Sequence, residues 1–79
     1  MERNEIFEKL TTIFREVFKD ETIIACEDLT SEEVKTWDSL TNMQMISAVE
    51  NYFNIKIQLR EIMKWKKVGD MVDSISKKI

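Results

Sequence analysis

The sequence has no histidine, no proline, one glycine and one cysteine among its 79 residues. With Cys26 alone the chain cannot form an internal disulfide, and without histidine the usual zinc ligand sets cannot be assembled. The absence of histidine also removes the commonest general base and leaves Cys26 without an imidazole to activate it. We therefore expect no metal site and no catalytic residues, so that the chain is not itself an enzyme.

Long apolar runs are also missing, because charged residues interrupt every short one. The first five residues are too polar for a signal peptide, so we expect no membrane insertion. A lone cysteine fits a reducing, cytoplasmic setting. The net charge of −3, from fifteen acidic and twelve basic residues, argues against binding to nucleic acid.

The length of the chain predicts one small domain, residues 1–79. Apolar residues recur at helical spacing in four stretches, which predict helices over residues 2–18, 39–53, 59–64 and 68–78. Possible strand segments are too short to build a sheet. The expected fold is therefore all-α, a four-helix bundle with a short third helix and a long loop between the first and second helices.

Each predicted helix has an apolar face that we expect to lie in the core. In the first helix this face consists of Ile6, Phe7, Leu10, Ile13, Phe14, Val17 and Phe18. In the second it consists of Met45, Ile46, Val49, Tyr52 and Phe53. In the third and fourth it consists of Leu59, Ile62 and Met63, and of Val68, Met71, Val72, Ile75 and Ile79. Asn54 is a plausible left-handed residue at the end of the second helix.

The long loop has no regular period. Its apolar residues are expected to anchor it to the helices, with Cys26 buried as a small apolar residue: Ile23, Ile24, Ala25, Cys26 and Leu29. Thr30 and Glu33 match a capping box and predict one helical turn. Loops of this length are often functional.

The segment Trp37-Asp38-Ser39-Leu40 stands where this loop meets the second helix. Asp and Ser are preferred N-caps, so a purely structural role as a helix cap is one interpretation. In the other, the Ser39 hydroxyl is an exposed acceptor for a phosphoryl group. A phosphodiester there would be stabilised by the free amides and the positive end of the helix dipole.

The chain resembles the acyl carrier protein family over nearly its whole length. The attachment motif is present as Asp38-Ser39-Leu40, and Met45, Ile46, Val49, Glu50 and Phe53 resemble the family's second helix. Ile57 and the segment Val68-Gly69-Asp70-Met71-Val72 resemble later parts of its pattern. The resemblance implies an acyl-carrier-like bundle with 4′-phosphopantetheine on Ser39. On that arm the protein would hold acyl intermediates as thioesters for fatty acid, polyketide or related specialised biosynthesis.

The resemblance also implies partners and a docking surface. The partners are a phosphopantetheinyl transferase, whose metal ion Asp38 would contact, and the enzymes that load and process acyl groups. The residues expected to bind cofactor or partners are Asp38 and Leu40 beside the serine, then Met43, Gln44, Ser47, Glu50 and Trp65. Leu40 and Met43 are equally well explained as ordinary surface residues. Thr41, Gln44 and Asn51 stand where acidic residues are typical of the family, which weakens the expectation that standard fatty-acid enzymes recognise the chain.

Two tryptophans need their own interpretation. Trp65, within Lys64-Trp65-Lys66-Lys67, is expected to pack as a lid over a solvated turn, with a specialised partner contact as the alternative. Trp37 is expected to anchor the loop before the serine. Because Trp-Asp-Ser-Leu also resembles D-alanyl carriers, an aminoacyl carrier is the second hypothesis for function. The third is a non-enzymatic helical interaction module in which Ser39 is only a cap. The protein is expected to be a monomer.

A carrier of this kind could open its core to take in an acyl chain. The candidates to line such a cavity are flexible or apolar, although they are equally consistent with an ordinary core: Met43, Met45, Ile46, Ile62, Met63 and Met71.

Overall fold

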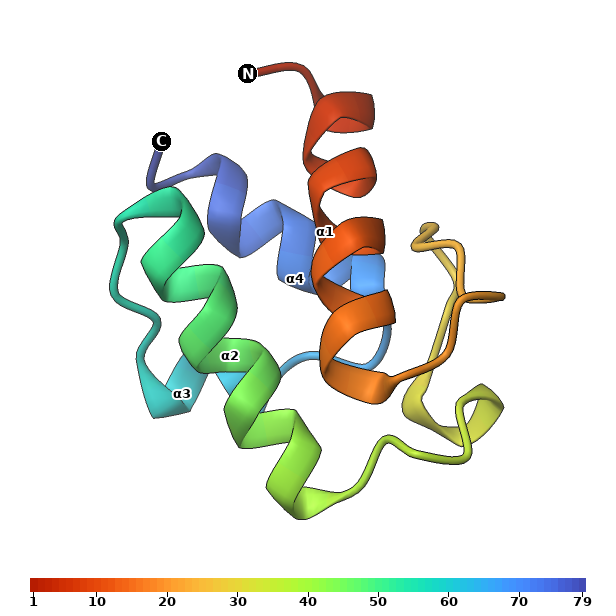
Figure 1. Ribbon diagram of the computed structural model, residues 1–79. Helices are drawn as coiled ribbons and strands as arrows, with labels where there is room; N and C mark the ends of the chain where they lie inside the picture. The colour runs from red at the N-terminus through yellow and green to blue at the C-terminus, as the bar shows by residue number, and fades with distance from the viewer.

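The computed structural model describes all of residues 1–79 and is entirely helical. The helices are α1 (Arg3–Phe18), α2 (Ser39–Phe53), α3 (Leu59–Ile62) and α4 (Val68–Ser76), and one 3-10 turn, η1 (Ser31–Glu33), lies in the long connection (Figure 1). The predicted all-α, four-helix architecture is confirmed. None of the helices combines the length and apolarity needed to cross a membrane.

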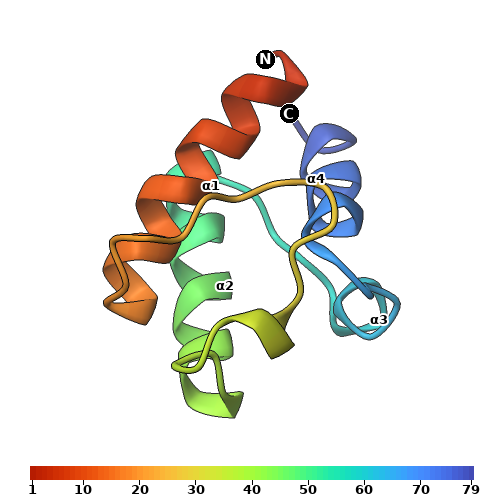
Figure 2. The same ribbon diagram turned by 90° about the vertical axis from the view of Figure 1, so that its right-hand side faces the viewer.

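Helix α1 packs against both α2 and α4. The two chain termini lie near each other at one end of the molecule, and α2 begins at the opposite end (Figures 1 and 2). The buried core draws on every predicted face except that of α3: Ile6, Leu10, Ile13, Phe14, Phe18, Ile23, Ala25, Val34, Met45, Ile46, Val49, Val68, Met71, Val72 and Ile75.

The helix boundaries follow local signals in the sequence. Helix α2 begins at Ser39, as predicted, and ends at Asn54 in the left-handed conformation with φ 55°. The single turn η1 has the predicted capping box between Thr30 and Glu33. Helices α3 and α4 end two residues earlier than predicted, which is the usual uncertainty at fraying ends.

The connection from residue 19 to 38 crosses one face of the bundle before it returns to α2 (Figure 2). Its backbone is tied to α4, because the N–H groups of Val68 and Gly69 donate to the carbonyls of Leu29 and Glu27 at 2.9 and 3.0 Å. It is also tied to α1, where Arg3 Nε lies 2.6 Å from Glu27 Oε2, and the same arginine links α1 to α4 because its Nη1 lies 2.8 Å from Asp73 Oδ1. The middle of the connection is therefore held by both α1 and α4.

Several predicted core residues are exposed instead. Ile24 and Cys26 face solvent while Ile23 and Ala25 are buried, because successive side chains of extended backbone point to opposite sides. The prediction that Cys26 is buried was therefore wrong.

In α3 only Ile62 packs on the core. Leu59, the first residue of the helix, and Met63, the residue after its end, are exposed. Tyr52 lies at the edge of the α2 stripe and is half exposed. Ile79 is exposed because α4 ends before it.

Candidate functional site

Ser39 is the first residue of α2, and its side chain is exposed. The residue before it, Asp38, is the N-cap in extended conformation, so the chain turns into the helix at the serine. Free backbone N–H groups and the positive end of the helix dipole are gathered at this point. An anion attached to the Ser39 hydroxyl would therefore be stabilised.

Asp38 and Thr41 form a reciprocal cap around Ser39. The Asp38 carboxylate accepts a hydrogen bond from the Thr41 N–H at 2.9 Å, and the Thr41 hydroxyl accepts one from the Asp38 N–H at 2.8 Å. The Thr41 hydroxyl in turn donates to the Thr36 carbonyl at 2.7 Å. The bond from the Thr41 N–H is the main cause that lowers the pKa of Asp38 from its ordinary value. Asp38 is thus a charged helix cap beside the serine.

Trp37 fixes the loop just before this cap, as predicted. Its ring stacks on Phe18 with centroids 4.7 Å apart and meets Phe14 edge-on at 5.4 Å. Its indole N–H donates to Asn42 Oδ1 on α2 at 2.9 Å. The backbone just before the exposed Ser39 is therefore fixed to α1 and α2 through the Trp37 side chain.

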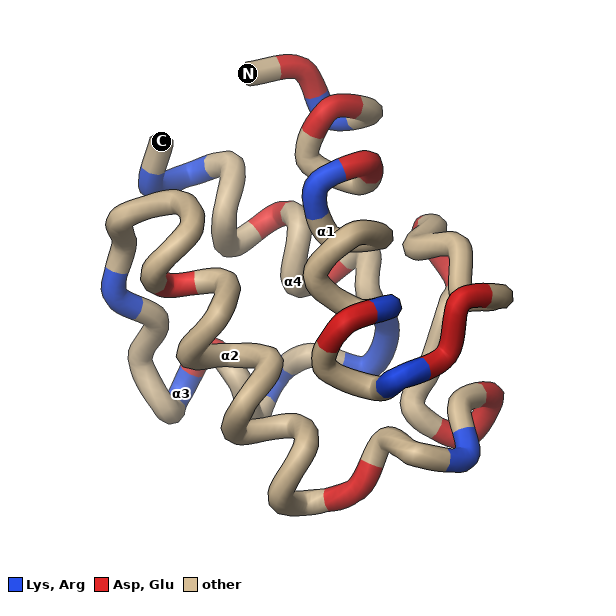
Figure 3. Tube along the Cα trace, viewed as in Figure 1, with Lys and Arg blue, Asp and Glu red and all other residues tan.

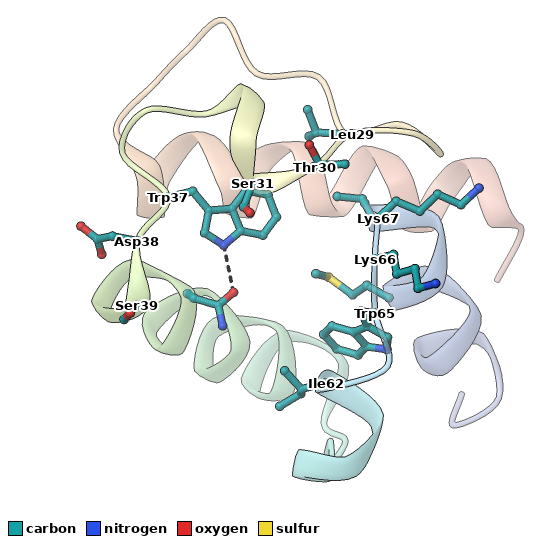
Figure 4. Close-up of a pocket in the computed structure, with 13 residues that line it drawn as sticks. Leu29, Thr30, Ser31, Trp37, Asp38, Ser39, Ile62, Trp65, Lys66 and Lys67 are labelled. Carbon is teal, nitrogen blue, oxygen red and sulfur yellow. Dashed lines mark hydrogen bonds between the residues drawn. The ribbon is translucent and has the colours of Figure 1, made fainter.

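A pocket of about 410 Å³ opens beside Ser39 (Figure 4). It lies between the long connection, the start of α2, the end of α3 and the segment leading into α4. Its lining residues are Leu29, Thr30, Ser31, Trp37, Asp38, Ser39, Asn42, Ile62, Trp65, Lys66, Lys67, Val68 and Met71. A volume of this size is at the lower end of the range for small-molecule sites.

Trp65 forms the wall opposite Trp37, and it is half-buried as the predicted lid would be. Its indole N–H donates to Ser74 Oγ on α4 at 2.9 Å. The segment after it is held by Asp70, whose Oδ2 accepts from the Lys66 N–H at 2.8 Å and the Lys67 N–H at 3.2 Å. The hydrogen bonds from these backbone N–H groups lower the pKa of Asp70, and the bond from Lys66 has the largest effect.

The residues predicted for docking divide into three groups. Leu40, Met43, Gln44 and Ser47 are exposed along α2, with Leu40 68% and Met43 62% exposed. Glu50 is half-buried, and its Oε2 accepts the Ile57 N–H at 2.8 Å, so the carboxylate holds the start of the α2–α3 connection. Trp65 lies at the pocket, apart from the exposed α2 residues.

Six residues were predicted to line a cavity in an opened core. In the closed structure Ile62 and Met71 line the pocket beside Ser39, Met45 and Ile46 lie in the core, and Met43 and Met63 are exposed. Sequence reasoning missed Leu29, Thr30, Ser31 and Asn42 as lining residues. The first three come from the aperiodic loop, where no pattern predicts which side chains turn inward. The only signal for Asn42 was its place one helical turn after Asp38.

Comparisons with known proteins agree with this geometry. A sequence model of the family described as "Phosphopantetheine attachment site" matches residues 8–75. Among solved structures, the solution NMR structure of a holo acyl carrier protein from Geobacter metallireducens is similar to this chain with a TM-score of 0.86. The two are 39% identical, and the match covers 91% of this chain and 83% of that one. No curated protein matches the sequence.

Proposed function

Since this chain belongs to the phosphopantetheine-bearing acyl carrier protein family, we propose that Ser39 is the residue that carries its 4′-phosphopantetheine. The observation that supports this assignment is the position of Ser39, exposed and first in α2. Ser47, the other serine of that helix, lies two turns further along and has neither the cap nor the free amides.

The proposed attachment is a phosphoryl transfer from coenzyme A. The Ser39 oxygen attacks the phosphorus next to the pantetheine, adenosine 3′,5′-bisphosphate leaves, and the hydroxyl proton passes to a base of the transferase. This chain has no histidine to act as that base, so a separate transferase must activate the hydroxyl. The protein contributes an exposed hydroxyl and a helix end that favours the phosphodiester.

We propose that the finished protein is a carrier of acyl intermediates for fatty acid, polyketide or related specialised biosynthesis. The arm supplies a thiol on which acyl groups are held as thioesters. The carrier is then a substrate of several enzymes rather than an enzyme itself. An aminoacyl cargo is the competing outcome, and incubation of the modified protein with ligases for fatty, hydroxy and amino acids separates the two by the mass of the attached group.

The partner surface proposed for these enzymes is the exposed side of α2 beside the serine. It consists of Leu40, Met43, Gln44 and Ser47. Residues 39–49 carry no charge, so the part of α2 beside the serine is electrically neutral, and the negative Glu50 one turn after Ile46 accepts the Ile57 N–H (Figure 3). We therefore propose partner enzymes that recognise α2 through apolar contact rather than through basic patches.

The compartment and the assembly state are parts of the same proposal. Cys26 is a free, exposed thiol, which fits a reducing cytoplasm. We also propose a monomer, because a second copy covering Leu40 and Met43 would block access to Ser39.

The decisive test is co-expression of the chain with a broad-specificity phosphopantetheinyl transferase, followed by intact mass measurement. We expect a gain of one phosphopantetheine group per chain. Ser39→Ala should abolish the gain, and Ser47→Ala, which removes an exposed hydroxyl of the same helix, should leave it unchanged. A chain that gains no mass, or a gain that survives Ser39→Ala, would favour a helical interaction module in which Ser39 is only part of a cap.

A further inference from the structure

The charges of this chain are divided unevenly between its two halves. Residues 1–38 hold eleven acidic and five basic residues, whereas residues 39–79 hold four acidic and seven basic ones. Four of those seven basic residues stand close together, in α3 and the segment after it: Arg60, Lys64, Lys66 and Lys67. A molecule of net negative charge therefore has a local positive surface, along the blue segments at α3 and before α4 in Figure 3.

The carboxylates near these four cations leave most of their charge unpaired. Glu61 is half-buried and engaged with the last turn of the chain, where its Oε2 lies 3.0 Å from Lys78 Nζ. Asp70 accepts from backbone N–H groups rather than from ammonium groups. Of the four cations only Lys67 has a carboxylate partner, with its Nζ 3.5 Å from Asp28 Oδ1. The other three are exposed and are available to an external carboxylate.

Two apolar side chains lie within the same surface. Leu59 is 69% and Met63 76% exposed. The Met63 N–H donates to the Leu59 carbonyl at 3.0 Å, so the helical turn continues through Met63 and the two side chains lie on one face. Ile62 is the residue of α3 that packs on the core. The outward face of α3 therefore combines apolar contact area with positive charge.

We propose that this face is a docking site for a second protein that presents carboxylates around an apolar side chain. We name it the basic α3 surface, and it consists of Leu59, Arg60, Met63, Lys64, Lys66 and Lys67. Charge complementarity identifies the partner, because the cations pair with carboxylates at the rim while the two apolar side chains supply a desolvated centre.

This surface is separate from the neutral start of α2. Figure 2 shows α3 apart from α2, next to the segment that leads into α4. The proposal goes beyond the arm at Ser39 and does not depend on it, since the surface contains no residue of the α2 cap.

An anionic membrane is the competing ligand for a basic surface, and the structure favours a protein. Two apolar side chains offer little area for insertion into a bilayer. Trp65, the aromatic residue of the segment, is half-buried and donates to Ser74, so it is not available as a membrane anchor. The side chain of Asp28 is 90% exposed beside Lys67, and a flat anionic bilayer would meet this like charge. A protein surface can be shaped to avoid it.

The test is a titration of the isotope-labelled full chain with a synthetic helical peptide that has glutamates on both sides of a leucine stripe. Backbone amide resonances report the binding site, and we expect shifts at residues 59–67 and none at residues 40–47. Raising NaCl from roughly 0.05 M to roughly 0.3 M should weaken binding about tenfold, because the cations are exposed. A peptide with lysine in place of glutamate should not bind. Chains with and without the arm should behave alike.

Charge-reversal variants test the role of the cations. Lys64→Glu combined with Lys66→Glu should weaken peptide binding more than about tenfold. The matched control is Lys9→Glu combined with Lys35→Glu, which changes the net charge equally at exposed positions outside the surface. It should weaken binding less than about twofold.

A second pair of variants tests the apolar centre. Leu59→Ala combined with Met63→Ala should weaken binding about fivefold. A peptide with alanine in place of its leucines should bind this variant and the native chain equally. All the substituted positions are exposed, and thermal melts check that each variant is folded.

Several results would overturn the proposal. These are no binding of the glutamate peptide, equal binding by the native chain and the Lys64→Glu, Lys66→Glu variant, or shifts centred on α2. Tighter binding to phosphatidylglycerol vesicles than to the peptide would assign the surface to a membrane. Self-association that the same two substitutions abolish, measured by analytical ultracentrifugation, would assign it to a second copy of this chain. Failure to gain the arm in the intact mass would refute the proposed function and leave this test unaffected.

Discussion

Asp38 and Thr41 cap α2 in both directions, with the carboxylate accepting the Thr41 N–H at 2.9 Å and the Thr41 hydroxyl accepting the Asp38 N–H at 2.8 Å. Ser39 lies between these two residues in the sequence, but it takes part in neither of the two hydrogen bonds. The structural cap and the exposed hydroxyl therefore belong to different residues here. The two interpretations of Asp-Ser before a helix do not compete in this protein.

Asp38→Asn separates the structural role of Asp38 from a role in modification. Asn is as good an N-cap as Asp, so the melting temperature should hardly change, whereas Asp38→Ala should lower it by roughly 5 °C. If Asp38 also contacts the transferase's metal ion, Asp38→Asn should still slow phosphopantetheine transfer, because the amide carries no charge. Thermal melts followed by circular dichroism, together with initial rates from intact mass, measure both effects. Equal transfer rates for the native chain and the asparagine variant would leave Asp38 as a cap only.

Helix positions and the attachment motif were predictable because each depends on local sequence. The periodic apolar residues of α1, α2 and α4 predict their buried faces, and Asn54 and the Thr30–Glu33 capping box mark ends that the structure shows at the same residues. Propensity and spacing act over one or two turns, a range that a single sequence records directly.

The pocket could not be predicted in the same way, because its walls come from segments far apart in the chain. Trp37 and Trp65 face each other only after the long connection crosses from α1 to α4 and back. The prediction that Leu59 and Met63 are buried was wrong for a related reason. Both have helical spacing, but α3 is a single turn on the surface. Tertiary packing decides whether such side chains are buried or exposed, and periodicity alone carries no information about tertiary packing.

Gly69→Ala should destabilise the protein although Gly69 is inside a helix. Alanine is favoured over glycine in helices by about 1 kcal/mol. Here, however, a Cβ would press on the Glu27 carboxylate and lie 3.0 Å from the Glu27 carbonyl oxygen, at the point where the connection joins α4. Overpacking of this kind costs about 1–3 kcal/mol, so we expect a net loss of about 1 kcal/mol in urea unfolding.

The control for this prediction is Ser76→Ala, an exposed position of the same helix where nothing is in contact with the change. It should be neutral or slightly stabilising. If Gly69→Ala raised the unfolding midpoint as Ser76→Ala does, the close approach of the connection to α4 would be wrong.

Acid should destabilise the protein through a defined set of carboxylates. Hydrogen bonds and ion pairs lower the pKa of five of them below the ordinary values of 3.8 for Asp and 4.5 for Glu: Asp20, Glu27, Asp38, Glu61 and Asp70. A lowered pKa means that the unfolded chain binds protons more readily, so the stabilisation is complete above these ordinary values and is lost as the pH falls through the folded values. The melting temperature should therefore be flat at neutral pH and fall below about pH 4.5.

Asp70→Asn tests one member of this set. The amide oxygen can still accept from the Lys66 N–H but does not titrate, so the acid limb of the stability curve should become shallower. Glu8→Gln, on the exposed side of α1, should leave that limb unchanged. Because these carboxylates are exposed or half-buried, added salt should weaken the effect, most of all for the exposed Glu27 and Asp38.

Recognition by the transferase should depend on two apolar side chains and be almost insensitive to salt. Leu40 and Met43 are exposed next to Ser39 on a stretch of α2 without charge, so an enzyme that reaches the hydroxyl must cover them. Replacing both with alanine should lower kcat/KM for phosphopantetheine transfer about tenfold, as the loss of central apolar contacts does at other interfaces. The melting temperature should stay close to that of the native chain, because neither side chain is in the core.

The salt titration distinguishes this mode of binding from one based on charge. Between roughly 0.05 M and roughly 0.5 M NaCl, contacts between exposed charges are progressively screened, whereas apolar contact is not weakened. If the transferase recognises α2 through apolar contact, kcat/KM for phosphopantetheine transfer should change by less than about twofold over this range. Leu59→Ala serves as the control for a general loss of exposed apolar surface, and it should leave the rate unchanged because α3 lies away from the serine. A steep fall in rate with salt, or equal rates for the double variant and the native chain, would show that the enzyme binds a charged surface elsewhere on the molecule.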